Sequence, residues 1–455
     1  MNERQQQIVK SVDLHRQLIL DAERWLWAHP QTGYTEWEAH GYMQEHFGAL
    51  GYELTPAGNI PGFYTDVDTG RDGPRLCIMA ELDALDLASH PEAVNGMAHA
   101  CGHHGQLAAL LGIAAALKEP GALDGLSGSI RLMVVPAEEM IQLGFREELR
   151  QKGVIRYMGG KAEFMYRGFF DDVDIALMVH GGVEDDGGRL AFNACRGMNG
   201  CMAKTFRFKG RAAHAGSIPH KGINAQYAAT LGLQACNNLR ETFPEKDTIR
   251  FHPILLGANC AVNIIPDEMK IETFVRANNM EAIQRENSKI NRAMAGAALA
   301  MGAGVEIHDR PGYAPETHSR DFMELCERSC VELVGRDAVN FDYGLLETGS
   351  SDFGDLTMVM PGMQFYATGA AGNGHGIDYR VADAERLCVN AAKVQLFIAE
   401  KLLEKNAMEA GAILASYRPV YPSIAAYFEA IDKLFLDKDA VIYHDDGSIT
   451  VDLTN

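Results

Sequence analysis

The sequence is poor in basic residues and has no long apolar run. It contains 41 Lys and Arg against 61 Asp and Glu, which gives a formal net charge of -20 at pH 7. Because nucleic acids and anionic membranes attract positive surfaces, this balance argues against either as a general partner. The longest mainly apolar run, residues 293–304, is shorter than the roughly 20 residues that a membrane-spanning helix needs. We therefore expect no nucleic-acid partner and no membrane association.

The cysteines also lack the pattern of a disulfide framework. There are nine, an odd number, and they are scattered along the chain, which is typical of a reduced protein. The first residues, Met1–Gln6, are not followed by the apolar stretch of a signal peptide. Together these features predict a cytoplasmic protein. At 455 residues the chain is too long for one ordinary core, which favours two domains.

The most informative segment is His99-Ala100-Cys101-Gly102-His103-His104. It brings a thiol and three imidazoles into six residues, directly before an apolar run at residues 107–113. Sulfur and imidazole are the donors that zinc and its neighbours in the first transition row prefer. The segment therefore predicts a metal site.

Four apolar segments separated by helical patterns predict strands, at residues 76–80, 130–135, 175–179 and 363–367. Strands that are apolar on both faces indicate a sheet covered on both sides by helices. In such sheets the ligand crevice lies beyond the carboxyl ends of the strands. Metal-type residues follow these strands: Asp83, Glu138, Glu139, His180 and His375. We expect these side chains to meet.

Other patterns outline the rest of the chain. Apolar spacing predicts a helix from about Ile8 to Ala28. Thr35–Glu38 has the form of a capping box, so another helix should begin there and end near Gly48–Gly51. A small hairpin is expected around Asp445–Gly447.

The middle of the chain, from about Gly197 to Gly312, has a different order. Strand-like segments lie at residues 203–208, 248–255 and 269–275, and helical segments lie at residues 224–239 and 281–301. This order is of the β-α-β-β-α-β type, which indicates an α/β sandwich inserted into the first domain.

Seven segments, in order along the chain, resemble one family. They are residues 99–103, 136–139, 180–182, 210–216, 263–267, 351–355 and 374–376. The family comprises co-catalytic metallopeptidases and includes aminoacylases, glutamate-releasing carboxypeptidases and aminobenzoyl-glutamate hydrolases. The chain is most similar to the amidohydrolase subgroup, whose metal loop reads His-Ala-Cys-Gly-His. The resemblance extends to about residue 405.

The resemblance implies an α/β fold in two domains. Residues 1–196 and 313–455 would form a discontinuous catalytic domain that resembles the zinc exopeptidases, with a mixed sheet covered by helices on both faces. Residues 197–312 would form an inserted ferredoxin-like α/β sandwich that acts as a lid and dimerisation domain. A homodimer is the implied assembly.

The resemblance also implies a metal-dependent amidohydrolase with two divalent metal ions. Zinc is the first choice, with manganese or cobalt as alternatives. Five residues match the family's metal ligands, with the thiol in the bridging position: Cys101, His103, Glu139, His180 and His375.

The same comparison assigns roles to other residues. Glu138 would be the general base and acid. His214 would stabilise the oxyanion, in the active site of the partner protomer. Asn263 and Arg276 would hold the substrate carboxylate, a task that suits the bidentate fork of arginine. Asp83 would orient a histidine ligand.

The implied substrate is a small-molecule amide with a free carboxylate: an N-acyl amino acid, an aminobenzoyl-glutamate-like compound or a dipeptide. Three segments depart from the subgroup. His104-Gly105-Gln106 replaces the usual Asp-Gly-His, Glu81 stands where much of the subgroup has Asp, and Ser351 replaces a more frequent Glu. These departures leave the acyl group and the amino acid of the substrate open.

Structural interpretations stand beside these roles. Cys101 could be a buried small hydrophobe, Glu138-Glu139 a solvated pair, His214 a loop histidine and Arg276 a salt-bridge partner on a sheet. A different class of function is a catalytically inactive metal-binding dimer that acts as a carrier or scaffold. A structural zinc site would normally have four ligands grouped in close pairs, whereas these are spread over most of the chain.

Overall fold

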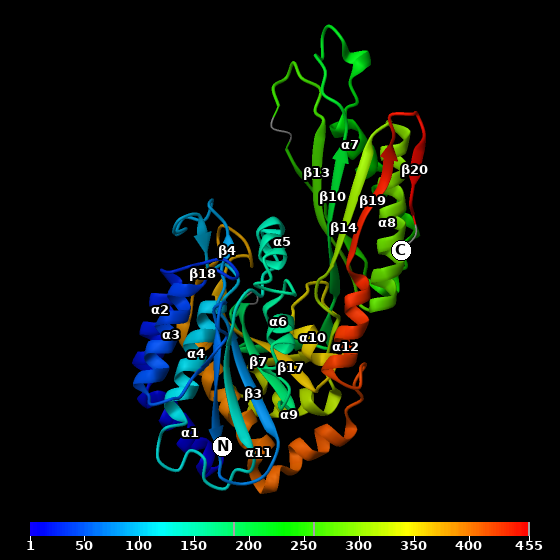
Figure 1. Ribbon diagram of the computed structural model, residues 1–455. Helices are drawn as coiled ribbons and strands as arrows, with labels where there is room; N and C mark the ends of the chain where they lie inside the picture. Colours follow the sequence, from blue (N-terminus) through cyan, green and yellow to red (C-terminus); the bar gives the residue numbers. More distant parts are fainter. Residues whose placement is uncertain (185–186, 258–259, 454–455) are drawn as a thin grey trace. The chain divides into compact units, whose positions relative to one another are not determined.

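The computed structural model describes residues 1–184, 187–257 and 260–453 (Figure 1). The chain forms two compact units. Unit 1 comprises Met1–Gly197, Thr317–Leu345 and Asp355–Ile424, and unit 2 comprises Met198–Glu316, Leu346–Gly354 and Ala425–Asn455. Among the helices of the described residues, none combines the length and the apolar character needed to cross a membrane.

Unit 1 is built on a mixed sheet. Its strands are, in spatial order, β1 (Thr55–Pro56), β2 (Phe63–Asp68), β6 (Ser129–Val135), β3 (Arg75–Glu81), β7 (Ile175–Val183), β17 (Gly362–Ala371), β8 (Phe192–Cys195) and β16 (Val339–Asp342), with β18 (Arg380–Val381) paired to β17. The central strands β6, β3, β7 and β17 are parallel. Their carboxyl ends therefore lie at one edge of the sheet, and the four strands predicted from the sequence are confirmed.

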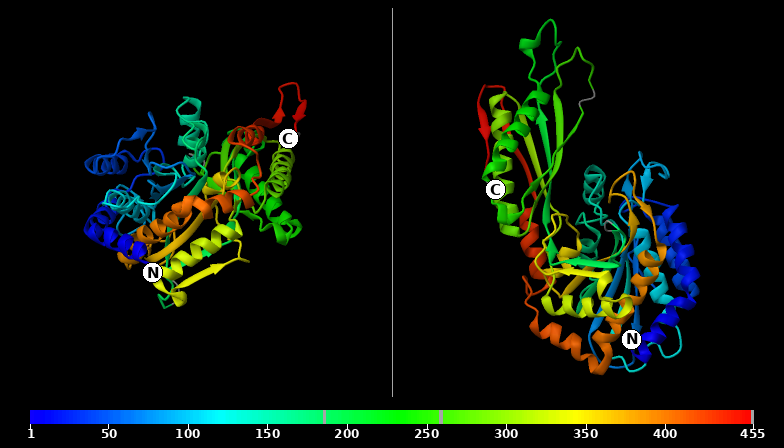
Figure 2. Two further views of the ribbon diagram at one scale, coloured as in Figure 1. Left: turned by 90° about the horizontal axis from the view of Figure 1, so that it is seen from below. Right: turned by 180° about the vertical axis from the view of Figure 1, so that it is seen from behind.

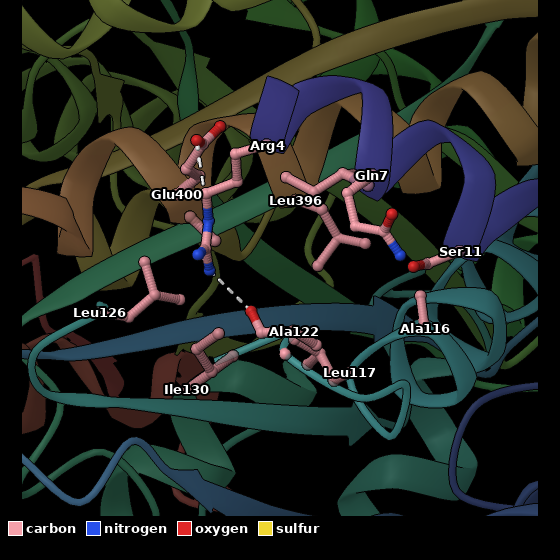
Figure 3. A pocket seen from close by; sticks show the side chains of 13 residues that line it. Arg4, Gln7, Ser11, Ala116, Leu117, Ala122, Leu126, Ile130, Leu396 and Glu400 are labelled. Atoms are coloured by element: carbon pink, nitrogen blue, oxygen red, sulfur yellow. Dashed lines mark hydrogen bonds and ion pairs between the residues drawn. The ribbon is translucent and has the colours of Figure 1, made fainter. Parts of the chain in front are cut away.

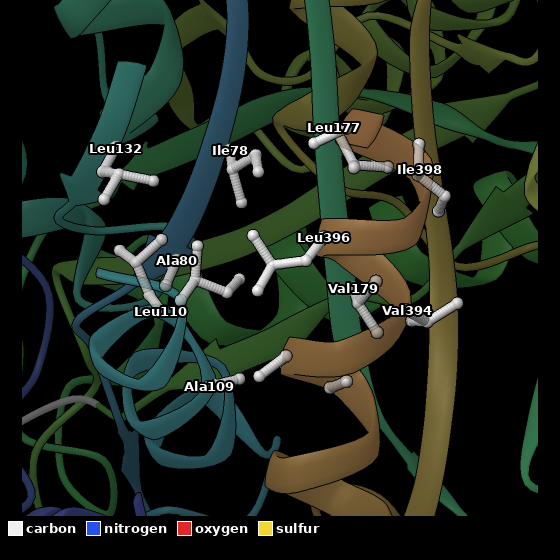
Figure 4. Packing of buried hydrophobic residues seen from close by; sticks show 14 of the residues in the cluster. Ile78, Ala80, Ala109, Leu110, Leu132, Leu177, Val179, Val394, Leu396 and Ile398 are labelled. Atoms are coloured by element: carbon white, nitrogen blue, oxygen red, sulfur yellow. The ribbon is translucent and has the colours of Figure 1, made fainter. Parts of the chain in front are cut away.

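Helices cover both faces of this sheet. Those of unit 1 are α1 (Glu3–Leu14), α2 (Arg16–Trp27), α3 (Trp37–Ala49), α4 (His103–Ala116), α5 (Leu143–Gln151), α6 (Gly160–Tyr166), α9 (Arg320–Val334) and α11 (Ala391–Ser416). On one face Ile78 and Leu177 pack with Leu110 of α4 and Leu396 of α11 (Figure 4). Every residue of β3 after Arg75 is buried, so the opposite face is covered as well, as predicted.

Unit 2 contains the predicted β-α-β-β-α-β order. Its elements are β10 (Gly200–Lys209), α7 (Ala225–Leu239), β11 (Arg250–Phe251), β12 (Ile254–Leu256), β13 (Glu268–Ala277), α8 (Met280–Ala300) and β14 (Gly304–Pro311). Helices α7 and α8 pack against each other and against β10 and β13 (Figures 1 and 2). Phe206, Ile271 and Met294 belong to the apolar core between helices and sheet, which gives the expected sandwich.

Three local predictions are wrong. The first helix is two helices, α1 and α2, because the backbone leaves helical geometry at His15. Helix α3 lies in the predicted range, but Thr35 forms no capping box; the N-cap is Glu36, whose side chain makes no capping bond. The predicted strand at residues 248–255 is split into β11 and β12, because Pro253 lies between them and cannot donate a ladder hydrogen bond.

The end of the chain also differs from the prediction. The sequence assigned residues 313–455 to the catalytic domain, but Ala425–Asn455 belongs to unit 2. The reason is that β19 (Leu436–Tyr443) pairs with β14, and β20 (Ile449–Val451) pairs with β19. The predicted hairpin is therefore confirmed, and it extends the sheet of unit 2. Helices α10 (Phe353–Thr357) and α12 (Ile424–Ile431) lie where the chain changes unit.

Candidate metal centre

The predicted metal loop follows β5 (Met97–Ala98), which pairs with β4 (Leu85–Asp86), and leads into α4. Gly102 has a φ of 99°, a conformation that favours glycine. A Cβ at this position would lie 2.8 Å from Tyr379 Oη. The glycine thus allows a tight turn between Cys101 and the first residue of α4, His103.

Cys101, His103 and His180 form a first donor group. One ligand atom from each residue lies within 4.8 Å of the others. Cys101 Sγ is 3.6 Å from His180 Nε2. His103 is fully buried at the start of α4, and His180 lies on β7. A thiol and two imidazoles converge here, which is a donor set that fits a divalent transition-metal ion.

Cys101, Glu139 and His375 form a second donor group, again within 4.8 Å. His375 Nε2 is 3.4 Å from Cys101 Sγ and 3.0 Å from Glu139 Oε1. The backbone of His375 has a φ of 61°, and its amide donates to Ala100 O at 2.8 Å. Because Cys101 belongs to both groups, its sulfur can be shared by two ions. All five predicted ligands therefore meet within unit 1, and they fit a dinuclear centre.

The charges around the centre favour the ionised ligands. Burial and the charge of Glu139 raise the pKa of Cys101, but His103 and His180 outweigh them and lower it to about 6. Burial likewise raises the pKa of Glu139, while the hydrogen bond and charge of His375 lower it to about 2. Thiolate and carboxylate are the forms that bind metal ions, so Cys101 and Glu139 are in their binding forms near neutral pH. The hydrogen bonds of Cys101 and Glu139 in turn raise the pKa of His375 to about 11, so an ion that binds there displaces a proton from the imidazole.

Asp83 lies beside His103, where an orienting residue was predicted. His103 Nδ1 is 2.8 Å from Asp83 O and 3.2 Å from Asp83 Oδ1. Asp83 Oδ2 also accepts a hydrogen bond from the amide of Glu139 at 2.7 Å. A proton on His103 Nδ1 satisfies these oxygens and leaves Nε2 as the metal donor.

Glu138 lies next to the donor groups and is 7% exposed. Ligand atoms of His103, Glu138 and Glu139 also lie within 4.8 Å of one another. A carboxylate this close to two metal ligands is within reach of a water molecule that the ions would hold. Proximity of this kind is the first requirement for a general base.

The predicted oxyanion residue, His214, belongs to unit 2 and is exposed. Its Nδ1 accepts hydrogen bonds from the amides of Gly216 and Ser217, each at 3.1 Å. A neutral imidazole that accepts at Nδ1 carries its proton at Nε2. The side chain therefore presents an N–H donor to solvent.

The two predicted carboxylate-binding residues also belong to unit 2. Asn263 lies beside His214, because Asn263 O accepts from the amide of Ala215 at 2.9 Å. Arg276 lies on β13, and its Nη1 donates to Ser350 Oγ at 3.2 Å. Within the described part of the chain no carboxylate forms an ion pair with Arg276, so the salt-bridge interpretation has no support there. The guanidinium group of Arg276 therefore retains N–H donors for a ligand.

Three buried residues near the centre were not assigned to it from the sequence. Glu81 Oε2 is 3.2 Å from His103 Nε2 and accepts from Gln106 Nε2 at 2.7 Å, while Oε1 pairs with Lys161. Burial raises the pKa of Glu81, but Lys161 and then His103 lower it to about 2. In the sequence, Glu81 and Gln106 stand out only as positions at which this chain differs from the amidohydrolase subgroup. The available signal for Lys161 was a lysine in residues 159–165, a segment that is small and apolar apart from Lys161 and Glu163.

A separate small pocket with a cavity volume of about 40 Å³ lies between α1, α4 and α11 (Figure 3). Arg4 crosses it, donates to Ala122 O at 2.8 Å and lies 3.7 Å from Glu400. Leu126 and Leu396 add apolar walls. None of the predicted site residues lines this pocket, so it is not part of the metal centre.

Comparisons with known proteins agree with this geometry. Residues 77–401 match the model of peptidase family M20/M25/M40. The Xaa-Arg dipeptidase of Mus musculus is 29% identical over 75% of this chain and 74% of its own. One chain of the p-aminobenzoyl-glutamate hydrolase of Escherichia coli is 30% identical over 61% of this chain and 62% of its own. A dinuclear metal-binding peptidase of Bacillus subtilis shares the fold, with a TM-score of 0.60 at 20% identity, over 85% of this chain and 97% of its own.

The family match covers both donor groups and both adjacent glutamates, and nothing in the comparisons supports the carrier alternative. The donor groups meet where parallel strands end, as the sequence predicted. The chain therefore belongs to peptidase family M20/M25/M40, as a metal-dependent hydrolase of C–N amide bonds.

Proposed function

We propose that the chain hydrolyses the amide bond of a small N-acyl amino acid, an aminobenzoyl-glutamate-like compound or a dipeptide with a free carboxylate. The observation that carries the proposal is the sharing of Cys101 by two donor groups, with Glu138 beside them. The names of the relatives support the substrate class, since they include a dipeptidase, a chain of an aminobenzoyl-glutamate hydrolase and an N-acetyl-L-cysteine deacetylase.

The centre would hold two divalent metal ions. Cys101, His103 and His180 would bind one, and Cys101, Glu139 and His375 would bind the other. Such a pair, when bound, polarises a carbonyl and makes water acidic enough to attack at neutral pH. Zinc is the first choice because the donors are thiolate and imidazole; manganese and cobalt are the alternatives.

Each side chain of the proposed site has its own role in amide hydrolysis. Glu138 takes the proton of the attacking water and delivers it to the leaving nitrogen. His214 donates from Nε2 to the oxygen that becomes negative in the transition state. Arg276 pairs with the substrate carboxylate through two hydrogen bonds, and Asn263 adds an amide donor. Asp83 holds His103 in the orientation that directs Nε2 to the ion.

A direct test loads the protein with zinc, manganese or cobalt in turn and measures amine release from N-acyl amino acids, aminobenzoyl-glutamate and dipeptides. Hydrolysis of at least one class is expected, and blocking the substrate carboxylate as an amide should lower kcat/KM. Protein that holds two ions and hydrolyses none of the panel would instead act as a metal carrier.

Arg276→Lys should weaken recognition of the substrate carboxylate. Lysine keeps the charge but loses the bidentate fork, so kcat/KM should fall about 10-fold to 100-fold, mainly through a higher KM. The matched control is Arg207→Lys, an exposed arginine on the neighbouring strand β10. Steady-state kinetics on free-acid and amidated substrates give the comparison. If the loss is equal for both substrate forms, Arg276 does not bind the carboxylate.

We also propose that the protein forms a homodimer through unit 2. The edge strand β12 exposes Ile254, Leu255 and Leu256, at 46%, 44% and 36%, respectively. Helix α7 exposes Tyr227 and Leu231, one helical turn apart. An exposed apolar edge strand can pair with a second copy. Leu255→Lys should therefore give a monomer in light scattering, whereas Leu14→Lys on α1 should not change the mass.

The dimer proposal makes a sharp prediction about His214. If His214 serves the partner's site, inactive Glu138→Gln and His214→Ala proteins should complement each other after mixing. Half of the randomly reassociated dimers are hybrids with one complete site, so about a quarter of the wild-type activity should return. Activity that stays at the level of the single variants, with exchange of protomers verified, would place His214 in the site of its own chain.

A further inference from the structure

The turn that carries Glu138 and Glu139 has an unusual backbone. Ala137 has a φ of 59°, although it is neither glycine nor asparagine. A residue with a Cβ is strained in this left-handed region and persists there where its surroundings fix it. The turn follows β6 directly, since Pro136 is the next residue after the strand.

Buried side chains of acidic and basic residues bond the backbone of this turn on both sides. Ala137 N donates to Glu36 Oε1 at 2.8 Å, and Ala137 O accepts from Arg146 Nη1 at 3.2 Å. Glu139 N donates to Asp83 Oδ2 at 2.7 Å, and Glu139 O accepts from Arg146 Nη2. Glu36, Asp83 and Arg146 are all 1% exposed or less. Hydrogen bonds from a charged guanidinium in a dry interior are among the strongest that a protein makes.

Glu36 and Arg146, which we call the clamp, are themselves held in place. Arg146 Nη1 also donates to Met158 O, so the guanidinium ties three backbone carbonyls together. The segment before Glu36 packs against the same point, because a Cβ on Gly33 would lie 2.9 Å from Ala137 Cα and would meet Arg146. Glu36 and Arg146 come from segments 110 residues apart in the chain, yet both bond Ala137.

We infer that Glu36 and Arg146 are positioning residues that hold the strained Ala137 turn, and through it set the carboxylates of Glu138 and Glu139. The inference rests on the roles proposed above for those two glutamates. Neither positioning side chain needs to touch substrate. They act by fixing the backbone from which one carboxylate reaches the attacking water and the other reaches a metal ion.

Arg146→Lys tests the clamp, since lysine keeps the charge but has one nitrogen in place of the two, Nη1 and Nη2, from which arginine bonds the carbonyls of Ala137, Met158 and Glu139. We expect kcat to fall about 100-fold with KM within about threefold. The affinity for one of the two ions should weaken about 10-fold to 100-fold, measured by titration of the metal-free protein. The matched control is Arg131→Lys, which removes an equally buried fork that bonds Asp66, Asp172 and Phe169 O. It should change neither kcat nor metal affinity.

Two substitutions of Glu36 keep the test decisive if the lysine variant does not fold. Burial, followed by the charge of Asp83, raises the pKa of Glu36 well above its ordinary value, so glutamine is a close mimic that still accepts from Ala137 N. Glu36→Gln should retain wild-type kcat, and Glu36→Leu should lose about as much as Arg146→Lys. Equal activity of the Leu and Gln variants would overturn the clamp.

The outcome is separable from that of the proposed function. Glu138→Gln is measured in the same assay. If it retains normal turnover, the proposed role of Glu138 fails. If it is inactive while Arg146→Lys matches Arg131→Lys in kcat and metal affinity, the role of Glu138 stands and the clamp alone is wrong.

Discussion

Glutamine in place of Glu138 is expected to lower kcat by about 10²-fold to 10⁴-fold, the usual contribution of a general acid–base group. The amide has nearly the size and shape of the carboxylate but cannot accept the proton of the attacking water. Glu138 is separate from the five residues of the two donor groups that share Cys101, so both ions should still bind. The loss should therefore appear in kcat at full metal occupancy, measured by steady-state kinetics alongside metal analysis of the same sample.

The control for this substitution is Glu148→Gln. Glu148 is an exposed residue of α5 in a surface pair with Lys152, so its replacement should leave kcat unchanged. A Glu138→Gln protein that holds two ions and turns over normally would remove Glu138 from the mechanism.

Serine in place of Cys101 is expected to have the second large effect, the loss of both ions. The sulfur belongs to both donor groups, and a serine hydroxyl stays protonated where the thiol, with a pKa lowered to about 6, is ionised. His375→Ala should instead release one ion, because His375 belongs to one group of the pair that shares the sulfur. Activity of the serine variant should fall on the order of 10³-fold or more at limiting free metal.

Metal content per chain after dialysis against a weak chelator measures the difference between the two variants. Cys330→Ser, a buried cysteine of α9 outside both groups, should retain two ions. Retention of two ions by Cys101→Ser would show that the sulfur is not the shared ligand.

The sequence was sufficient for the parts of the site that are local in the chain. Parallel strands align their carboxyl ends, so residues that directly follow apolar strands meet whatever their separation in sequence. His180 and Glu139 were found in this way, because His180 follows the apolar segment of residues 175–179 in the second half of β7, and Glu139 lies four residues after the end of β6. The metal loop was found because its ligands occur within six residues.

The parts that depend on long-range packing could not be found in the sequence. Glu36 was placed in a capping pattern, which describes neighbours in the chain, whereas its side chain bonds Ala137, 101 positions away. The Glu81–Lys161 pair spans 80 positions and involves residues that are charged but fully buried. Strand β19 joins the sheet of unit 2 by pairing with β14. Pairing between strands that are distant in the chain leaves no local pattern in the sequence.

The account depends most on the claim that two ions share one sulfur, and a crystal of the zinc-loaded protein with anomalous scattering tests it directly. We expect two anomalous peaks in unit 1, each about 2.3 Å from Cys101 Sγ, one completed by His103 and His180 and the other by Glu139 and His375. A single peak, or two ions of which neither contacts Cys101, would contradict the proposed dinuclear centre.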